Sequence, residues 1–145
     1  MKALIQRVSK ASVAIAGETR STIDTGLLVL LGVEKNDNQK IANRLIDKLL
    51  TDRGFPDEAG KMNRSVQDIN GEILLVSQFT LAADTRSGTR PGFSRAAEPL
   101  LAKELYQHAI ACLDQRIKLK TGEFGADMQV SLVNDGPVTF MLEVE

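Results

Sequence analysis

Polar side chains that could take part in chemistry gather first at the end of an apolar run. Ile73-Leu74-Leu75-Val76 contains no polar residue, which is typical of a strand covered on both faces, and Ser77-Gln78-Phe79-Thr80 follows it directly. Hydroxyl and amide groups at a strand end beside a loop suit a binding or catalytic site. The alternative is structural, because such groups also satisfy the backbone where a strand ends.

A second polar segment, Asn134-Asp135-Gly136-Pro137, lies between two alternating apolar patterns near the end of the sequence. Asp-Gly in this position predicts a β-hairpin, and an ordinary turn is one interpretation of it. The proline adds another, because an X–Pro bond adopts the cis form at a cost of only about 0.5–1 kcal/mol. A fixed Gly-Pro unit would present its carbonyl groups rigidly, with no side chain in the way.

Three arginines form the third feature. Arg86, Arg90 and Arg95 fall within ten residues, and no acidic residue lies among them. A loop of this kind suits contacts with phosphate groups. A solvated polar loop is the alternative, and the sequence does not favour either.

The residue types that usually drive side-chain acid–base chemistry are scarce. The only histidine, His108, falls on the apolar stripe of a predicted helix, and the only cysteine, Cys112, lies one turn further along that stripe. We expect both to be packing residues, which argues against a histidine-dependent serine or cysteine triad. No metal-ligand spacing and no Gly-rich phosphate loop is recognisable.

Length and composition narrow the class of protein. The 145 residues predict one domain, residues 1–145, and 43% hydrophobic residues are enough for a core without disulfides. The net charge of −1 argues against binding to nucleic acid through bulk charge. Because no apolar run is long enough to span a membrane and the first residues lack a signal-peptide core, a soluble, cytoplasmic protein is expected.

Periodicity then predicts the elements that must position these segments. Helices are expected over 37–51, capped by Asn36 or Asp37, and over 96–115, with Pro99 in the first turn. Short strands are expected over 3–8, 11–16, 27–31, 73–81, 116–120, 130–132 and 138–144, and strand ends with a turn over 54–60. Two helices are too few to cover both faces of a large parallel sheet. The fold class expected is therefore α+β, with mixed or antiparallel strands and both helices packed on one side.

Taken together, the motifs closely resemble the D-aminoacyl-tRNA deacylases, the bacterial D-tyrosyl-tRNA deacylase family. The resemblance covers Met1 to Val144, and its two signatures are Ser77-Gln78-Phe79-Thr80 and Asn134-Asp135-Gly136-Pro137-Val138-Thr139. Further matching segments are 3–8, 26–34, 60–63 and 81–84. The sequence departs from the family at Gly54, Gly92 and Met141, where a bulky aliphatic residue, serine and tryptophan are common.

The resemblance implies hydrolysis of the ester between a D-amino acid and the 3′-terminal ribose of tRNA, and of glycyl esters on mischarged tRNA. It also implies a homodimer without metal or organic cofactor. In such a dimer, a cis Gly136-Pro137 peptide reaches the partner's pocket, whose floor is Ser77-Gln78-Phe79-Thr80, and Arg7 helps to hold the Gly-Pro segment. Arg86, Arg90 and Arg95 would grip the end of the tRNA.

The residues leave the mechanism open between two routes. In one, the ribose 2′-OH assists and backbone N–H groups near Phe79 and Thr80 stabilise the oxyanion. In the other, Thr80 attacks and forms an acyl-enzyme. The missing base for Thr80 favours the RNA-assisted route. The competing functions are a non-catalytic module that binds the tRNA end and a general amino-acid esterase.

Overall fold

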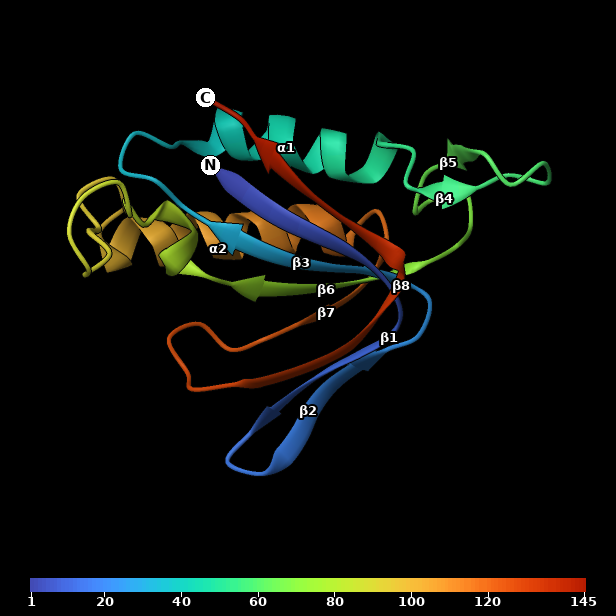
Figure 1. Ribbon diagram of the computed structural model, residues 1–145, viewed down its shortest axis with the longest axis horizontal. Helices are drawn as coiled ribbons and strands as arrows, with labels where there is room; N and C mark the ends of the chain where they lie inside the picture. The colour runs from blue at the N-terminus through green and yellow to red at the C-terminus, as the bar shows by residue number, and fades with distance from the viewer.

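One mixed six-stranded sheet forms the centre of the protein, and its strands follow the order β2-β1-β3-β6-β7 (Figure 1). Strand β3 pairs with the first half of β1 and β2 with its second half, whereas β8 pairs with both halves. The computed structural model describes residues 1–145. The strands of this sheet are β1 (Lys2–Ile15), β2 (Glu18–Ile23), β3 (Gly26–Gly32), β6 (Glu72–Ser77), β7 (Lys118–Thr121) and β8 (Gln129–Glu143). The pairs β1–β2, β1–β3 and β1–β8 are antiparallel, whereas β3–β6 and β6–β7 are parallel.

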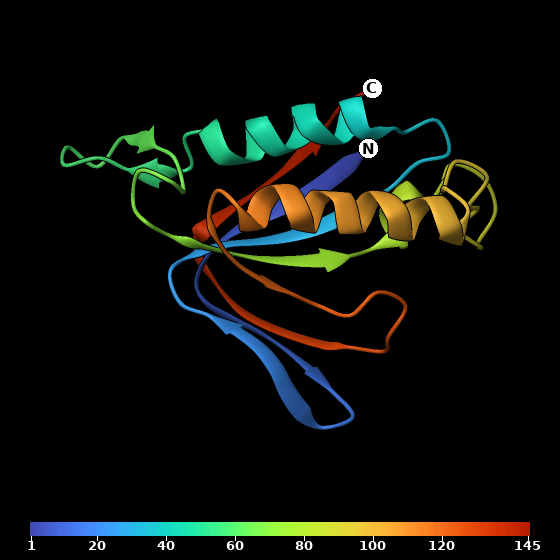
Figure 2. The same ribbon diagram turned by 180° about the vertical axis from the view of Figure 1, so that it is seen from behind.

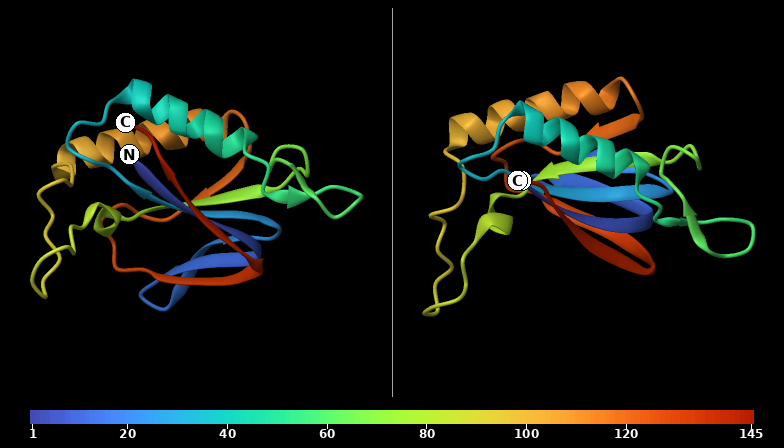
Figure 3. Two further views of the ribbon diagram at one scale, coloured as in Figure 1. Left: turned by 45° about the horizontal axis from the view of Figure 1, so that its top comes forward. Right: turned by 90° about the horizontal axis from the view of Figure 1, so that it is seen from above.

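The two parallel pairs exist because a helix makes each crossover. Helix α1 (Gln39–Thr51) connects β3 towards β6, and α2 (Pro99–Asp114) connects β6 to β7. Both helices lie on the same face of the sheet and run side by side (Figure 2; Figure 3). The expected α+β class with two helices on one side is confirmed.

Buried residues form two clusters on opposite faces of the sheet. The larger one fills the space under the helices and includes Leu27, Val29 and Leu31 of β3. The smaller one includes Leu28 and lies where β1 and β2 curl beneath the sheet. The expectation that the apolar run Ile73–Val76 is covered on both faces is confirmed as well, because Ile73 and Leu75 lie in the larger cluster and Leu74 and Val76 in the smaller one.

The helix starts differ from expectation. Asn38 caps α1, since its Oδ1 accepts a hydrogen bond from the Ile41 N–H at 3.0 Å, so neither Asn36 nor Asp37 is the cap. Asp37 instead accepts from the Glu34 N–H and from the N-terminal amine. Helix α2 begins at Pro99 rather than at residue 96, because the Ala97 N–H donates to the Val33 carbonyl.

Two long strands replace four short ones. The expected strands 3–8 and 11–16 are parts of one continuous strand, β1, which ends at Ile15, and β8 is continuous through Asn134-Asp135-Gly136-Pro137. The predicted hairpin turn at that segment is wrong. Both halves of β8 pair with β1, and residues 135–138 bulge out opposite Arg7 alone. Strand β2 has one buried residue, Ile23, and escaped prediction because it lacks an alternating apolar pattern.

A small hairpin extends from the end of α1. It consists of β4 (Phe55–Pro56) and β5 (Met62–Arg64), in agreement with the strand ends and turn expected at 54–60. Its turn is fixed by Asp57, whose carboxylate accepts from the Ala59 and Lys61 N–H groups and the Asn63 amide.

None of the helices has the length and apolar composition that a membrane span requires.

Tyr106 is the only tyrosine, and the sequence has no tryptophan, so its ultraviolet absorbance reports on one site. Its hydroxyl donates to the Leu75 and Gly122 carbonyls, and burial raises its pKa from 10.0 to about 12. We expect the tyrosinate band to appear with a midpoint near pH 12 in the folded protein and near pH 10 in denaturant. Because the folded state then binds the proton more tightly, the free energy of unfolding should decrease as pH rises from 10 to 12, and Tyr106→Phe should lack this component.

Candidate active site

A cavity of about 540 Å³ opens where β6 ends. Ser77, Gln78 and Phe79 line one side of it. The rest of its wall is mainly apolar and is contributed by Val76, Ala97, Pro99, Ala102, Phe124, Gly125, Ala126, Met128 and Val130. The cavity therefore lies between the carboxyl end of a central strand, the start of α2 and the connection from β7 to β8.

The first signature changes direction at the cavity. Ser77 is the last residue of β6, the Gln78 N–H donates to the Leu31 carbonyl at 2.8 Å, and a 3₁₀ helix, η1 (Phe79–Ala82), follows. The first hydrogen bond of this helix runs from the Leu81 N–H to the Gln78 carbonyl. The Phe79 and Thr80 N–H groups precede it and so have no acceptor within the helix. The interpretation of this segment as a functional strand end is consistent with the geometry.

Thr80 has a partner that cannot accept its proton. Its Oγ1 lies 2.6 Å from Nε2 of Gln78, which donates a hydrogen bond to it. Thr80 is exposed and is not among the residues that line the cavity. An amide group is not a base, so this arrangement does not activate Thr80 as a nucleophile.

An exposed aromatic pair lies beside the cavity. The ring centroids of Phe79 and Phe93 are 5.1 Å apart at an interplanar angle of 49°. Phe79 is 57% exposed and Phe93 is 39% exposed, which is unusual for rings of this size. The pair connects η1 to the end of the loop that precedes α2.

The loop between η1 and α2, residues 83–98, carries the three arginines and projects away from the body of the protein (Figure 3). Asp84 and Gly92 exchange two backbone hydrogen bonds across its base, of 2.7 and 2.8 Å. Arg86 donates to both oxygens of Asp84 and holds the pKa of that carboxyl well below its usual range, so the pair stays ionised. Arg95 lies 3.8 Å from Glu34, so Arg90 alone of the three has no carboxylate partner.

The second signature forms the bulge in β8, defined here as residues 135–138. The Gly136-Pro137 peptide is cis, and Gly136 has φ +136°, a region that favours glycine. Arg7 supports the bulge from β1: its Nε donates to the Asp135 carbonyl and its Nη1 to the Gly54 carbonyl, both at 3.0 Å. Asn134 closes the bulge by accepting from the Val138 N–H and donating to Thr139.

The two signatures lie far apart within one chain. Ser77 pairs with Leu31, whereas the bulge lies opposite Arg7, which pairs with Leu27. From the bulge to Ser77 there are four residues along β3 and three steps between strands, from β8 through β1 and β3 to β6. These give a separation of about 20 Å between the two signatures. Figure 1 shows the same arrangement, with η1 at the left end of the sheet and the bend of β8 at the right.

His108 and Cys112 lie away from both signatures. His108 Nε2 is 2.7 Å from Asn43 Oδ1 at the contact between α1 and α2, and Cys112 Sγ is 3.6 Å from the same nitrogen. The expectation that these are packing residues is consistent with these contacts.

Sequence reasoning missed most of the cavity wall. Ala97, Pro99 and Ala102 line it because α2 begins there, and residues 124–128 line it because the β7–β8 connection folds back. Small apolar residues and a glycine-containing loop form no sequence motif from which a cavity wall could be predicted. Only Gly122 and Gly125, on either side of Phe124, marked this connection as irregular.

Gly54, one of the departures from the family pattern, has space for a side chain. A Cβ there would meet nothing closer than Phe140 ring carbons at 3.9 Å, and its φ is not positive. We expect Gly54→Ala to raise the free energy of unfolding by about 0.4–1 kcal/mol, because it restricts the unfolded chain. Gly26→Ala is the matched control, since its Cβ would collide with the Glu72 backbone. Denaturant titrations showing that both variants destabilise the protein would contradict this account of Gly54.

Comparison with known proteins agrees with the motifs. A family model described as "D-Tyr-tRNA(Tyr) deacylase" matches residues 4–143. Proteins called D-aminoacyl-tRNA deacylase from Stutzerimonas stutzeri and Haemophilus influenzae are 60% and 58% identical over 99% of this chain and 99–100% of their own length. The relative from Aliivibrio salmonicida is 56% identical over 99% of this chain and all of its own.

Two solved structures share the fold. One, titled "c-Myc DNA Unwinding Element Binding Protein", is 44% identical with a TM-score of 0.94, and 99% of this chain and 98% of that one are covered. The other, titled as a probable eukaryotic D-amino acid tRNA deacylase, is 13% identical with a TM-score of 0.83 over 97% of each chain, which shows the fold alone. The resemblance drawn from the motifs is confirmed, and the chain belongs to the D-Tyr-tRNA(Tyr) deacylase family of ester hydrolases.

Proposed function

We propose that this chain hydrolyses the ester that joins a D-amino acid, or glycine, to the 3′-terminal ribose of tRNA. Family membership supports the reaction class. The observation that carries the proposal is the cavity at the end of β6, which combines the polar groups of Ser77 and Gln78 with an apolar wall. Binding sites of this composition orient a ligand with a few polar groups and enclose it with apolar ones.

The bulge supplies chiral selection, and it does so in the partner's cavity. The strand register places the bulge about 20 Å from the cavity of the same chain. Gly136 and Pro137 are exposed, and Arg7 fixes the backbone next to them. Backbone carbonyls at this position accept hydrogen bonds from the α-amine, which all substrates share, and occupy the space that an L side chain needs. Glycine has no side chain to exclude, so its ester is cleaved as well.

An edge of the sheet supports the homodimer that this arrangement requires. Strand β8 pairs only with β1, so the opposite edge of its 15 residues is unpaired. Val130, Val133 and Met141 of β8 are 37%, 57% and 41% exposed. Long apolar edges are normally covered in natural proteins, and a second copy of the chain would cover this one.

The chemistry proceeds without a side-chain base. The ribose 2′-OH assists cleavage, and the Phe79 and Thr80 N–H groups stabilise the oxyanion. The hydrogen bond that Gln78 donates to Thr80 supports this route over an acyl-enzyme. Arg90 is the cation best placed to reach a phosphate of the tRNA end, whereas Arg86 and Arg95 contribute less because carboxylates already neutralise them.

The decisive experiment measures ester loss from D-, L- and glycyl-tRNA and from simple amino-acid esters. We expect rapid loss from D- and glycyl-tRNA only. Equal rates on simple esters would identify a general esterase. Binding of charged tRNA without turnover would identify a non-catalytic module, and preferential binding to DNA would favour the activity named for the 44%-identical structure.

Mixed dimers should reveal that each site draws on two chains. Gly136→Ala places a Cβ 2.8 Å from Val138 Cγ2 and 3.1 Å from Arg7 Nη2 and so displaces the bulge, and Ala126→Trp fills the cavity. We expect either variant alone to be inactive as a folded dimer. After subunit exchange, half of the dimers contain one intact site, so activity should return to about a quarter of the wild-type value. Sedimentation that finds an active monomer, or exchange that restores nothing, would contradict the shared site.

The substrate's 2′-OH should matter more than the Thr80 hydroxyl. Thr80→Ala removes a group that accepts a hydrogen bond but has no base, so we expect less than a tenfold loss of kcat. A D-aminoacyl-tRNA ending in 2′-deoxyadenosine, with the ester on the 3′ oxygen, should lose more than a hundredfold, the scale of a removed acid–base group. An acyl group trapped on Thr80 in mass spectrometry would decide for the threonine route.

A further inference from the structure

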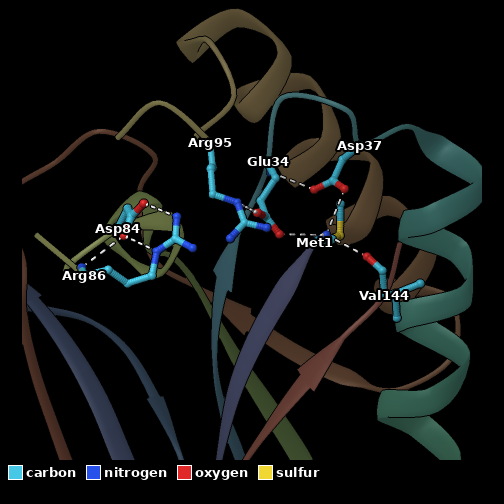
Figure 4. A network of polar contacts seen from close by, with 7 residues as sticks. All are labelled: Met1, Glu34, Asp37, Asp84, Arg86, Arg95 and Val144. Carbon is cyan, nitrogen blue, oxygen red and sulfur yellow. Dashed lines mark hydrogen bonds and ion pairs between the residues drawn. The ribbon is translucent and has the colours of Figure 1, made fainter. Parts of the chain in front are cut away.

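Met1 places its α-ammonium group inside the protein, against three acceptors, two from the connection between β3 and α1 and one from the C-terminal segment (Figure 4). The nitrogen lies 2.8 Å from Asp37 Oδ1, 2.8 Å from the Val144 carbonyl oxygen and 3.5 Å from Glu34 Oε1. Met1 is 1% exposed and Asp37 is 8% exposed. Each of the three N–H bonds of the ammonium thus has an acceptor, as a buried charge requires.

A chain of contacts joins this ammonium to the cavity wall. Asp37 binds the ammonium with one oxygen and the Glu34 N–H, at 2.7 Å, with the other. The backbone around Glu34 then pairs with the start of the α2 segment, where the Lys35 N–H donates to the Arg95 carbonyl and the Ala97 N–H to the Val33 carbonyl, both at 3.0 Å. Ala97 is part of the cavity wall.

The charges of the same network are balanced. The Glu34 carboxylate lies between the ammonium, at 3.5 Å, and Arg95 Nε, at 3.8 Å (Figure 4). Two cations therefore face two carboxylates, Glu34 and Asp37. If the amine loses its charge, one guanidinium remains for two carboxylates, and the buried Asp37 keeps no cation, since the ammonium is its only ion partner.

We propose that the free α-ammonium of Met1 is a positioning group for the active site, and that acylation of this nitrogen reduces activity. A formyl group, an acetyl group or a preceding residue converts the amine into an amide, which has one N–H and no charge. Such an amide cannot make the three contacts, so Asp37 and Glu34 lose their anchor and the wall at Ala97 shifts. The kinetic part of this inference rests on the proposed function, whereas the structural part does not.

A removable N-terminal extension tests the proposal in a single preparation. A protease site directly before Met1 gives a blocked protein before cleavage and a free ammonium after it. We expect the blocked form to have a Tm lower by about 10 °C and a kcat/KM for D-aminoacyl-tRNA lower by about tenfold or more, with both restored by cleavage. In the Asp37→Asn variant, cleavage should restore much less of the Tm and of kcat/KM.

Two further measurements separate positioning from stability alone. Assays well below both Tm values should still show the kinetic difference, and the amide NMR signals of Glu34, Ala96 and Ala97 should shift on cleavage. A lower Tm with unchanged kinetics and unchanged amide signals would overturn the positioning role, and an unchanged Tm would overturn the proposal entirely. If neither form cleaves D-aminoacyl-tRNA, the proposed function fails, and the NMR signals still decide the link.

A substitution covers the case in which the blocked form does not fold. Glu34→Gln, in the chain with a free Met1, removes the charge that faces both the ammonium and Arg95. We expect it to raise KM for charged tRNA more than it lowers kcat, and Glu34→Asp to recover part of the loss. Wild-type kinetics in Glu34→Gln together with unshifted Ala97 signals would contradict the proposal.

Discussion

The pairing of β1 with β8 along nearly their whole length is the constraint on which the rest of the structure depends. It holds both ends of the chain in the central sheet, and it is interrupted opposite Arg7, where residues 135–138 bulge out. Because Arg7 hydrogen-bonds to both Asp135 and Gly54, the bulge is joined to the segment that leaves α1. The ladder on either side leaves it no freedom to slide along β1. The position of the second signature relative to the cavity is thus set by strand register rather than by a flexible loop.

The candidate site relies on backbone groups more than on reactive side chains. The cavity has an apolar wall, the Gln78 amide is directed at Thr80, and the single histidine is bonded to Asn43 between the helices. A site built from backbone donors and acceptors does not depend on the protonation of a general base. In the proposed mechanism, the selectivity of such a site would come from the positions of rigid backbone groups.

Much of this arrangement could be predicted from the sequence, for physical reasons that differ by segment. The run from Leu27 to Leu31 is apolar on both faces, so its burial followed from composition alone. The bulge could not be predicted from local pattern, because Asp-Gly favours a hairpin and only the pairing of both halves of β8 with one partner excludes it. The cap of α1 was misplaced for a similar reason: Asp37 is a good capping residue by type, but a distant buried amine uses it instead. The cavity wall needed the tertiary fold, since alanines and a proline carry no chemical signal.

The separation of the two signatures by about 20 Å in one chain has a genetic consequence. In the proposed dimer, a chain defective only in its cavity still leaves one complete site when it pairs with a normal chain. A chain defective in both cavity and bulge leaves none. Its defective bulge enters the cavity of the normal chain, and the bulge of the normal chain enters its defective cavity. In a cell that also carries a normal copy of the gene, a copy with one lesion would therefore leave about half of all sites intact, whereas a copy with both lesions would leave only about a quarter, those in dimers of two normal chains.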